Sequence, residues 1–318
     1  MKSSMHILGF TAVIFFFSAC QKDKPGAVNM LSSDHNPRIA LNSNLIANQI
    51  PRAMVSNTIV ATDGSQKIVR LNSANVYLYE GGNVVDTLYP DLSGTAKTPF
   101  DFIGKYSLKE GKNYEIKAFD SKYPTASGNT TLPKDNYSVL VNSYSEQIIT
   151  DLIASYRVGK LNVTLTQTSD DDVEYVFVIE DQNDDMVFSV LCTENIDVFT
   201  SNFAQGKNTT DDENASFKNI GNRVVALSGS FKNSATTTIQ INPTNTKNEG
   251  DLTDNLVLKV YAYNKDKRLY ETSYDHYMEN NGGLGDSPPA EAVSLYQNVN
   301  QGYGTVMGQF LKTYTLVP

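Results

Sequence analysis

The chain has 318 residues, and its 35 acidic and 26 basic side chains give a formal net charge of −9, with no block of lysines and arginines. Neutralising nucleic-acid phosphates needs clustered Lys and Arg, so we expect no nucleic-acid partner. Chains longer than about 250 residues usually divide into more than one core, which predicts two domains.

Residues 1–19 have the features of a lipoprotein signal peptide. Ile7–Phe17 is almost entirely apolar but is shorter than the roughly 20 residues of a spanning helix. The small residues Ser18 and Ala19 directly precede Cys20, the arrangement that a lipoprotein signal peptidase needs. We therefore expect cleavage before Cys20 and acylation of its thiol as a membrane anchor. The alternative is an ordinary secreted protein with a cysteine near its cleavage site.

Residues 20–37 are polar and small, so they cannot bury enough apolar surface to order themselves. We interpret them as a flexible tether. From residue 38 onward, runs with alternating apolar and polar side chains predict antiparallel strands. The expected fold class is mostly β. Residues 38–135 are predicted to form an immunoglobulin-like β-sandwich, and 156–318 a second β-rich, sandwich-like domain with one or two short helices.

The predicted strands of the first domain lie at 38–45, 53–60, 74–79, 84–88, 105–108 and 114–119. Gly81 and Gly82 separate two of these runs and supply the positive φ angles of a tight hairpin. The predicted strands of the second domain lie at 156–165, 174–179, 186–191, 224–227, 236–241 and 256–263, and its short helices at 195–203 and 273–279. Residues 282–289 contain too much Gly and Pro for regular structure.

Cysteine usage excludes an intrachain disulfide. Cys20 and Cys192 are the two cysteines of the sequence, and an acylated Cys20 has no thiol to pair. Cys192 follows an apolar run and is predicted to be buried as a small apolar side chain. Trp is absent while Tyr and Phe are plentiful. The absence of Trp makes carbohydrate binding less expected without excluding it, because Tyr also stacks.

No recognisable metal site or cofactor site stands out. Asp181, Asn183 and Asp185 have the opening spacing of a calcium loop, but Met186 stands in place of the required glycine and Cys192 in place of the bidentate Glu. A polar hairpin turn explains these residues as well. We therefore expect neither a metal nor another cofactor.

The sequence also gives no reason to expect an enzyme. The segment 227–231 lacks the first glycine of a nucleophile elbow, and spacing nominates no partner for His276. Two of the many carboxylates could converge for glycoside hydrolysis, but nothing selects a pair. A hydrolase is therefore the minority alternative to a non-catalytic protein.

Several segments together resemble a known family. They are 38–45, 74–80, 108–114 and the closing stretch 288–304, in which a proline and an acidic residue precede an aliphatic-Tyr segment and a glycine-rich turn. In this order they are similar to the Bacteroidetes lipoprotein family with the domain of unknown function 4249. Gln297 departs from the family's small polar residue, Val299 stands for its Ile, and Asn300-Gln301 replaces an expected glycine.

The resemblance implies a two-part, mostly β lipoprotein of the outer membrane, often encoded beside TonB-dependent transporters. Cys20-Gln21-Lys22-Asp23 also looks similar to the surface-export signal of such lipoproteins, which implies that the protein faces the exterior. The expected function is that of a non-catalytic binding or accessory subunit with an unknown ligand. Tyr296, Asn298 and Tyr303 are the candidate binding or interface residues. The alternative is an adhesive lipoprotein that resembles fimbrial anchor subunits and exchanges or accepts edge strands.

Overall fold

A computed structural model describes residues 36–58, 69–91, 102–150, 155–169, 172–181, 189–202, 220–221, 223–242, 255–280 and 295–318. Arg38–Thr58 and Ile68–Pro318 form one compact unit, to which all elements below belong. The predicted signal peptide, Cys20 and nearly all of the predicted tether lie outside the described residues. The centre of the calcium-like turn and the Gly- and Pro-rich segment 282–289 also lie outside them.

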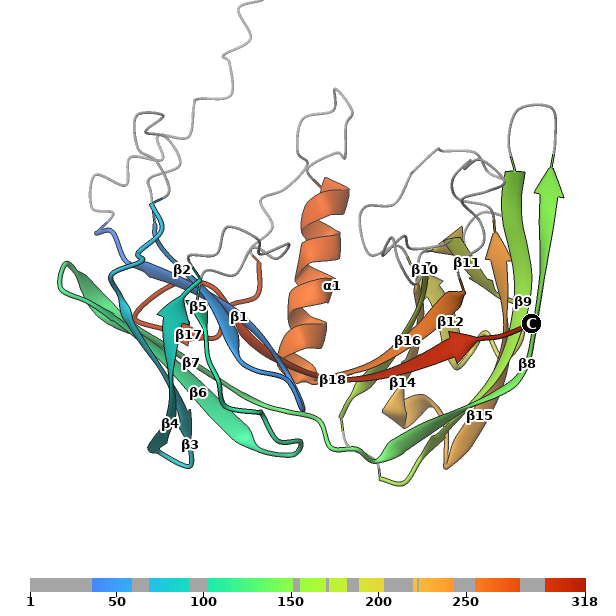
Figure 1. Ribbon diagram of the computed structural model, residues 1–318, viewed down its shortest axis with the longest axis horizontal. Helices are drawn as coiled ribbons and strands as arrows, with labels where there is room; N and C mark the ends of the chain where they lie inside the picture. The colour runs from blue at the N-terminus through green and yellow to red at the C-terminus, as the bar shows by residue number, and fades with distance from the viewer. Residues whose placement is uncertain are drawn as a thin grey trace, which may run out of the picture. The chain divides into compact units, whose positions relative to one another are not determined.

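Strands dominate the described residues, which confirms the mostly β fold (Figure 1). The first strands are β1(Ile39–Ile46), β2(Arg52–Asn57), β3(Asn75–Glu80), β4(Asn83–Pro90), β5(Phe102–Ile103), β6(Asn113–Asp120) and β7(Tyr123–Thr131). The next are β8(Tyr137–Thr150), β9(Ser155–Gln167), β10(Glu174–Asp181), β11(Ser189–Cys192), β12(Phe199–Asn202), β13(Ile220–Gly221), β14(Arg223–Leu227) and β15(Ser234–Asn242). The last elements are β16(Leu256–Tyr263), α1(Lys265–Asn280), β17(Val299–Asn300) and β18(Val306–Leu316), and a 3-10 turn, η3(Ser228–Ser230), follows β14.

The strands form two hydrogen-bonded series. Thirteen strands follow the order β12-β14-β10-β16-β18-β1-β2-β5-β4-β3-β6-β7-β17, and five follow the order β13-β11-β15-β9-β8. β1 pairs in parallel with β18 and antiparallel with β2, so strands from both predicted domains belong to one series (Figure 1). The domain boundaries at 135 and 156 remain predictions.

The alternation of apolar and polar residues that predicts strands appears in the structure as alternating burial. Along β1, buried and half-buried residues alternate without interruption, and Ile39, Leu41 and Leu45 are completely buried. In a strand, successive side chains point to opposite faces, so this alternation places one face of β1 in the core. β3 and β4 pair as the predicted hairpin, and φ is +59° at Gly81 and +83° at Gly82. Positive φ angles at both central residues are what a type I′ two-residue hairpin turn requires.

The prediction of a strand at 105–108 is wrong, because this segment has no regular secondary structure and belongs to no sheet ladder. The carboxylate of Asp86 accepts the amide protons of Lys105 at 2.6 Å and Tyr106 at 2.7 Å. A side chain of β4 therefore satisfies donors that a neighbouring strand would otherwise take. The alternation of apolar and polar residues in 105–108 did not reveal that a side chain would take these backbone hydrogen bonds in place of a neighbouring strand.

The prediction of a helix at 195–203 is also wrong. A turn at 196–198 leads into β12, which pairs with β14. Asn195 has φ +52°, and its side-chain Nδ2 donates to the carbonyl of Thr236 in β15. Phe199 is completely buried, with its ring centroid 6.0 Å from that of Phe177. Tertiary contacts therefore select the extended form.

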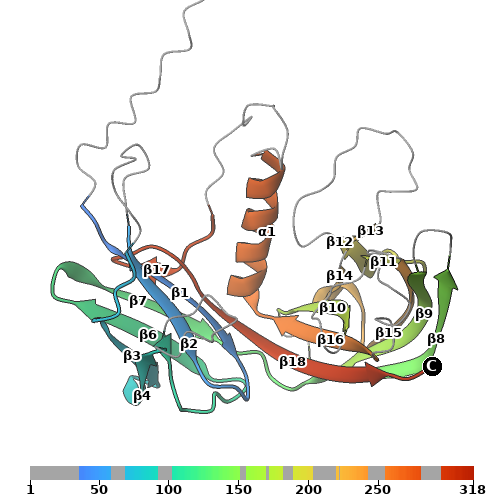
Figure 2. The same ribbon diagram turned by 45° about the horizontal axis from the view of Figure 1, so that its top comes forward.

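The predicted helix at 273–279 is the C-terminal part of a longer helix, α1. The helix packs against β16 and β18, and Figure 2 shows it rising from the end of β16. It begins directly after Asn264, whose Oδ1 accepts the amide proton of Lys267 at 3.0 Å. An Asn at this position is a standard N-cap, so the start of the helix carried a signal in the sequence.

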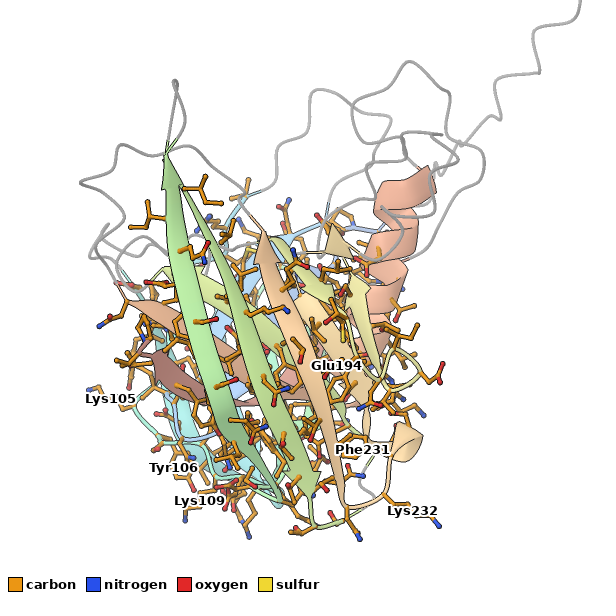
Figure 3. All side chains as sticks on the ribbon, turned by 90° about the vertical axis from the view of Figure 1, so that its right-hand side faces the viewer. Lys105, Tyr106, Lys109, Glu194, Phe231 and Lys232 are labelled. Atoms are coloured by element: carbon orange, nitrogen blue, oxygen red, sulfur yellow. The ribbon has the colours of Figure 1, made fainter. Side chains whose placement is uncertain are left out.

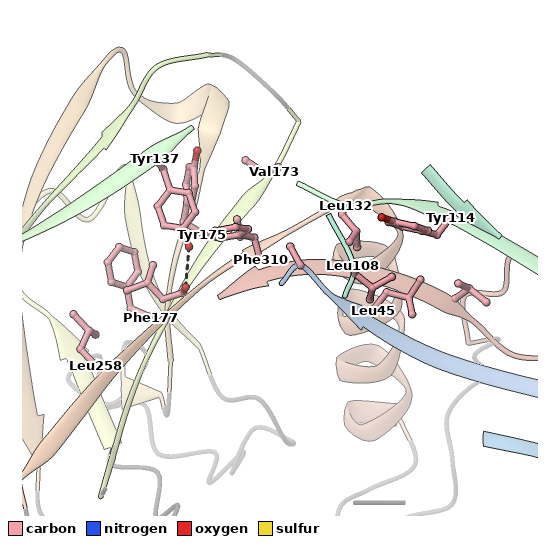
Figure 4. Close-up of a cluster of buried hydrophobic side chains, with 14 of the residues drawn as sticks. Leu45, Leu108, Tyr114, Leu132, Tyr137, Val173, Tyr175, Phe177, Leu258 and Phe310 are labelled. Carbon is pink, nitrogen blue, oxygen red and sulfur yellow. Dashed lines mark hydrogen bonds between the residues drawn. The ribbon is translucent and has the colours of Figure 1, made fainter. Parts of the chain in front are cut away.

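Buried aromatic rings connect the second series of strands to the first (Figure 4). The ring of Tyr137 in β8 lies 5.0 Å from that of Tyr175 and 6.0 Å from that of Phe310, measured between centroids. The hydroxyl of Tyr137 donates to the carbonyl of Val260 at 2.9 Å, so its burial leaves no orphan donor. The predicted burial of Cys192 is confirmed, and burial raises the pKa of its thiol.

Candidate functional site

The C-terminal segment 295–305, which carries the three candidate residues, lies between β7 and β1. β17 pairs with β7. After a turn, the amide of Tyr303 donates to the carbonyl of Ile39 at 3.0 Å, and the amide of Leu41 donates to the carbonyl of Tyr303 at 2.8 Å. Gly304 has φ +108°, and a Cβ there would lie 2.2 Å from the carbonyl oxygen of Leu41. Main-chain hydrogen bonds and a close approach therefore fix the segment.

The side chain of Asn298 closes this segment onto its neighbours. Its Oδ1 accepts the amide proton of Val306 at 2.8 Å. Its Nδ2 donates to the carbonyl of Val306 at 2.8 Å and to that of Asn129 at 3.3 Å. Both ends of the side chain thus bind main-chain groups of β18 and β7. The structure gives Asn298 a positioning contact, and its contact with a ligand or partner remains a prediction.

Tyr296 joins the segment to α1. Its amide donates to Ser273 Oγ at 2.8 Å, and its hydroxyl donates to Asp266 Oδ1 at 2.7 Å. Burial, followed by the hydrogen bond to the Asp266 carboxylate, raises the pKa of this hydroxyl to about 12. Tyr303 has a more accessible side chain, 39% exposed. Of the three candidate residues, Tyr303 is therefore the most exposed to solvent.

Asn264 is the centre of a polar junction that the sequence analysis missed. Its Oδ1 also accepts the amide proton of Gly308 in β18 at 3.3 Å. Its Nδ2 donates to Thr130 Oγ1 at 2.6 Å and to the carbonyl of Thr131 at 2.8 Å, both in β7. The Thr130 hydroxyl in turn donates to Asp266 Oδ2 at 2.8 Å. One buried amide thus caps α1 and connects it to two strands that are distant in sequence.

A hollow of about 390 Å³ lies beside this junction. Its lining comes from 129–134, from Asp172 and Val173, and from the start of α1 at 264–266, with Gly111 at one side. The lining includes both basic residues, Lys134 and Lys265, and acidic residues, Asp172 and Asp266. Mixed charge and main-chain groups in a hollow of this size suit a small polar ligand. In the part of the chain that the structure describes, no group of His, Cys, Asp and Glu side chains has the arrangement to hold a metal ion.

A network of charges fastens α1 to β14. Arg223 is almost completely buried, and its guanidinium contacts Glu271 at 3.2 Å and Asp275 at 2.8 Å. Lys267 pairs with Glu271 and lies over the ring of Tyr263, 5.2 Å from its centroid. The network thus links α1 to β14 through charge-assisted hydrogen bonds. Its members come from 223 and from 263–275, so no local motif in the sequence pointed to it.

Comparison with known proteins identifies a family for this chain. The family model described as Domain of unknown function (DUF4249) matches residues 28–313. No curated protein matches the chain. A solved carbohydrate-binding module of the β-sandwich superfamily aligns with 8% identity over 67% of this chain and 94% of that chain, with a TM-score of 0.17. That score is too low to support a conclusion about this chain. Across the described ranges, no helix has the length and apolar character that would let it cross a bilayer.

Proposed function

The chain belongs to the family described as Domain of unknown function (DUF4249), and from this premise we propose that it is a lipid-anchored outer-membrane lipoprotein. In this proposal it acts as a non-catalytic binding or accessory subunit. The observation that carries the proposal is Ser18-Ala19-Cys20 behind an apolar run. A cysteine that carries a diacylglycerol and a further acyl chain anchors a protein stably. The β unit is then the soluble body of the molecule.

The proposed partner is a TonB-dependent transporter, and the proposed location is the outer face of the membrane. The resemblance to lipoproteins encoded beside such transporters supports the partner. The segment Cys20-Gln21-Lys22-Asp23, which is similar to a surface-export signal, supports the location. In the segment 295–305, Tyr303 is 39% exposed and is the proposed point of contact with the partner.

Metabolic labelling with an alkyne analogue of palmitate tests the anchor. We expect the wild-type protein to be labelled and to sediment with outer membranes, and Cys20→Ala to be unlabelled. The matched control is Cys192→Ala, which removes the chain's other cysteine and should leave the labelling intact. Equal labelling of wild type and Cys20→Ala would refute the anchor.

A pull-down of the tagged, detergent-extracted protein tests the partner. We expect a TonB-dependent transporter in stoichiometric amount, and we expect Tyr303→Ala to recover less of it. Tyr89→Ala serves as the control, because Tyr89 is also exposed (58%) but lies in β4. Recovery of the lipoprotein without any transporter would contradict this part of the proposal.

An adhesive role is a second candidate, and β8 favours it. This 14-residue strand ends the order of the five-stranded series and pairs with β9 (Figure 3). Leu140, Ile148 and Ile149 are large apolar side chains of β8 that are 63%, 45% and 47% exposed. A long, apolar edge strand is a template for strand addition. Recovery of fimbrial subunits in the same pull-down supports this role, and a protein that stays monomeric and outside filaments argues against it.

A further inference from the structure

A hollow of about 580 Å³ lies on the solvent face of β3, β6, β7 and β17. The opposite face of these strands points into the core, where Leu78, Ile116 and Ala126 are completely buried. Strand pairing places Tyr77 opposite Lys117, Lys117 opposite Ser127, and Ser127 opposite Asn300. The floor of the hollow is therefore a regular sheet surface, and its rim includes the turn after β17. We call it the β3–β17 hollow.

Aromatic rings in the β3–β17 hollow are held in fixed positions. The ring of Phe119 packs against that of Tyr77 in an edge-to-face arrangement, with the centroids 5.8 Å apart. The ammonium of Lys117 lies over the ring of Tyr79, 4.6 Å from its centroid. These contacts restrain Phe119 and Lys117 before any ligand arrives. A ligand that uses them then loses less conformational entropy on binding.

The remaining lining groups are neutral and hydrogen-bonding. Thr125 and Ser127 contribute hydroxyls from β7, and the exposed Asn300 and Gln301 contribute amides. Hydroxyl and amide groups both donate and accept hydrogen bonds. An aromatic ring beside such groups matches a pyranose, which has an apolar C–H face and a polar edge of hydroxyls.

Charge narrows the class of ligand. Among the described residues, the lining of the β3–β17 hollow has one ammonium, that of Lys117, and no carboxylate. Glu115, which pairs with Lys117 at 3.2 Å, is not part of the lining. A ligand carboxylate would share this ammonium with Glu115, since an ammonium donates three hydrogen bonds.

We propose that the β3–β17 hollow binds an acidic saccharide, a pyranose that carries a carboxylate. The sugar ring stacks on Phe119, its carboxylate pairs with Lys117, and its hydroxyls bind Ser127, Asn300 and Gln301. Tyr79 is a positioning residue that keeps the ammonium over its ring. This inference rests on the proposed binding function and gives it a class of ligand.

Calorimetric titration of the full-length lipidated protein in detergent tests the inference. The probes are hexasaccharides of galacturonate, mannuronate and hyaluronan, together with the methyl ester of the galacturonate hexamer. We expect at least one of the acidic oligomers to bind, with an affinity that falls as salt rises. If galacturonate binds, its methyl ester should bind at least tenfold more weakly.

Two substitutions localise the binding. Phe119→Leu keeps the apolar volume and removes the ring, and Lys117→Met keeps the apolar stem and removes the charge. Each should weaken binding at least tenfold without changing the thermal midpoint by more than a few degrees. The matched controls come from a second Tyr–Lys pair outside the hollow, in which Lys105 lies 6.0 Å from the ring centroid of Tyr89. Tyr89→Ala and Lys105→Met should bind like the wild type.

Three results would overturn the inference. They are failure of all three acidic hexasaccharides to bind, equal binding of the galacturonate hexamer and its ester, and undiminished binding by both hollow variants. Acyl labelling at Cys20 and the pull-down are separate measurements on the same protein. A failure of the saccharide proposal is therefore distinguishable from a failure of the proposed lipoprotein function.

Discussion

Asn264 shows how much one buried amide contributes to this unit. It caps α1 and also binds main-chain and side-chain groups of β7 and β18. We expect Asn264→Ala to lower the free energy of unfolding by about 2–3 kcal/mol, since a lost N-cap costs about 1 kcal/mol and unsatisfied buried partners cost about 1–3 kcal/mol more. Urea denaturation measures the change. The control is Asn142→Ala, because Asn142 donates to Asn162 and Thr164 on an exposed surface. An equal loss in both variants would contradict the central position of Asn264.

Gly304 is a position where a side chain has no room. Its φ is +108°, and a Cβ at this position would lie only 2.2 Å from the carbonyl oxygen of Leu41, so both features oppose Gly304→Ala. We expect a loss of at least about 3 kcal/mol and faster hydrogen exchange of amides in 298–305. Gly229→Ala is the control, because nothing lies within 4 Å of its Cβ position and we expect a change below about 0.5 kcal/mol.

Glu174 gives the stability a specific pH dependence. Burial raises the pKa of its carboxyl group above the ordinary value of 4.5, and the positive charges of Arg223 and Arg268 partly oppose this effect. Between the unfolded and the folded pKa, the folded chain holds more protons than the unfolded chain. The free energy of unfolding therefore falls as pH rises through this window.

Removing the carboxyl group of Glu174 tests whether it makes the free energy of unfolding fall as pH rises. We expect Glu174→Gln to lose less stability than wild type between pH 4 and pH 7, as followed by urea denaturation at each pH. Glu110→Gln, which changes an exposed carboxylate in a turn, should follow the wild-type curve. A steeper loss in Glu174→Gln than in wild type would show that its carboxylate is stabilising at neutral pH.

At the scale of elements, α1 depends on the buried guanidinium of Arg223. Removing one partner of a buried ion pair leaves uncompensated charge and typically costs about 3–5 kcal/mol. We expect Arg223→Met to lie near the lower end of this range, about 3 kcal/mol, because Lys267 still accompanies Glu271. Hydrogen exchange along α1 and urea denaturation provide the measurement.

A second arginine serves as the matched control for this element. Arg268 forms a two-pronged pair with Asp172, at 2.6 and 3.1 Å, but the Asp172 side chain is 64% exposed. Exposed pairs contribute at most about 1 kcal/mol, so Arg268→Met should change stability little. If both variants lose the same stability, the burial of Arg223 is not what fastens the helix.

Elements were predictable where local sequence and local contacts agreed. The Gly81-Gly82 hairpin and the alternation of β1 needed no knowledge of distant residues. The segments 105–108 and 195–203 were mispredicted because Asp86 and Phe177, which lie far away in sequence, decide their conformations. The start of α1 was missed although Asn264 signals it, because a single capping residue is a weaker signal than a run with apolar periodicity.

At the scale of the whole molecule, the parallel pairing of β1 with β18 joins the beginning and the end of the described chain. We expect a fragment of residues 38–135 to lack a cooperative unfolding transition by circular dichroism, because β1 loses one of its two neighbours and β7 loses β17. The full mature chain, unfolded under the same conditions, provides the reference transition. A fragment that unfolds cooperatively would support the predicted boundary near 135 as that of an independent domain.

The sequence by itself determined the β character, the hairpin turn, the burial of Cys192 and the membership of the family, because these follow from short-range patterns and from the order of motifs. It also singled out the segment 296–303. Only the tertiary structure decided which groups this segment contacts. Asn298 binds main-chain groups, and the hydroxyl of Tyr296 binds Asp266. Asn300 and Gln301 instead line the β3–β17 hollow. The reason is physical, since a side chain's role there depends on which partners strand pairing brings within hydrogen-bond distance, and β7, α1 and β18 come from three distant parts of the chain.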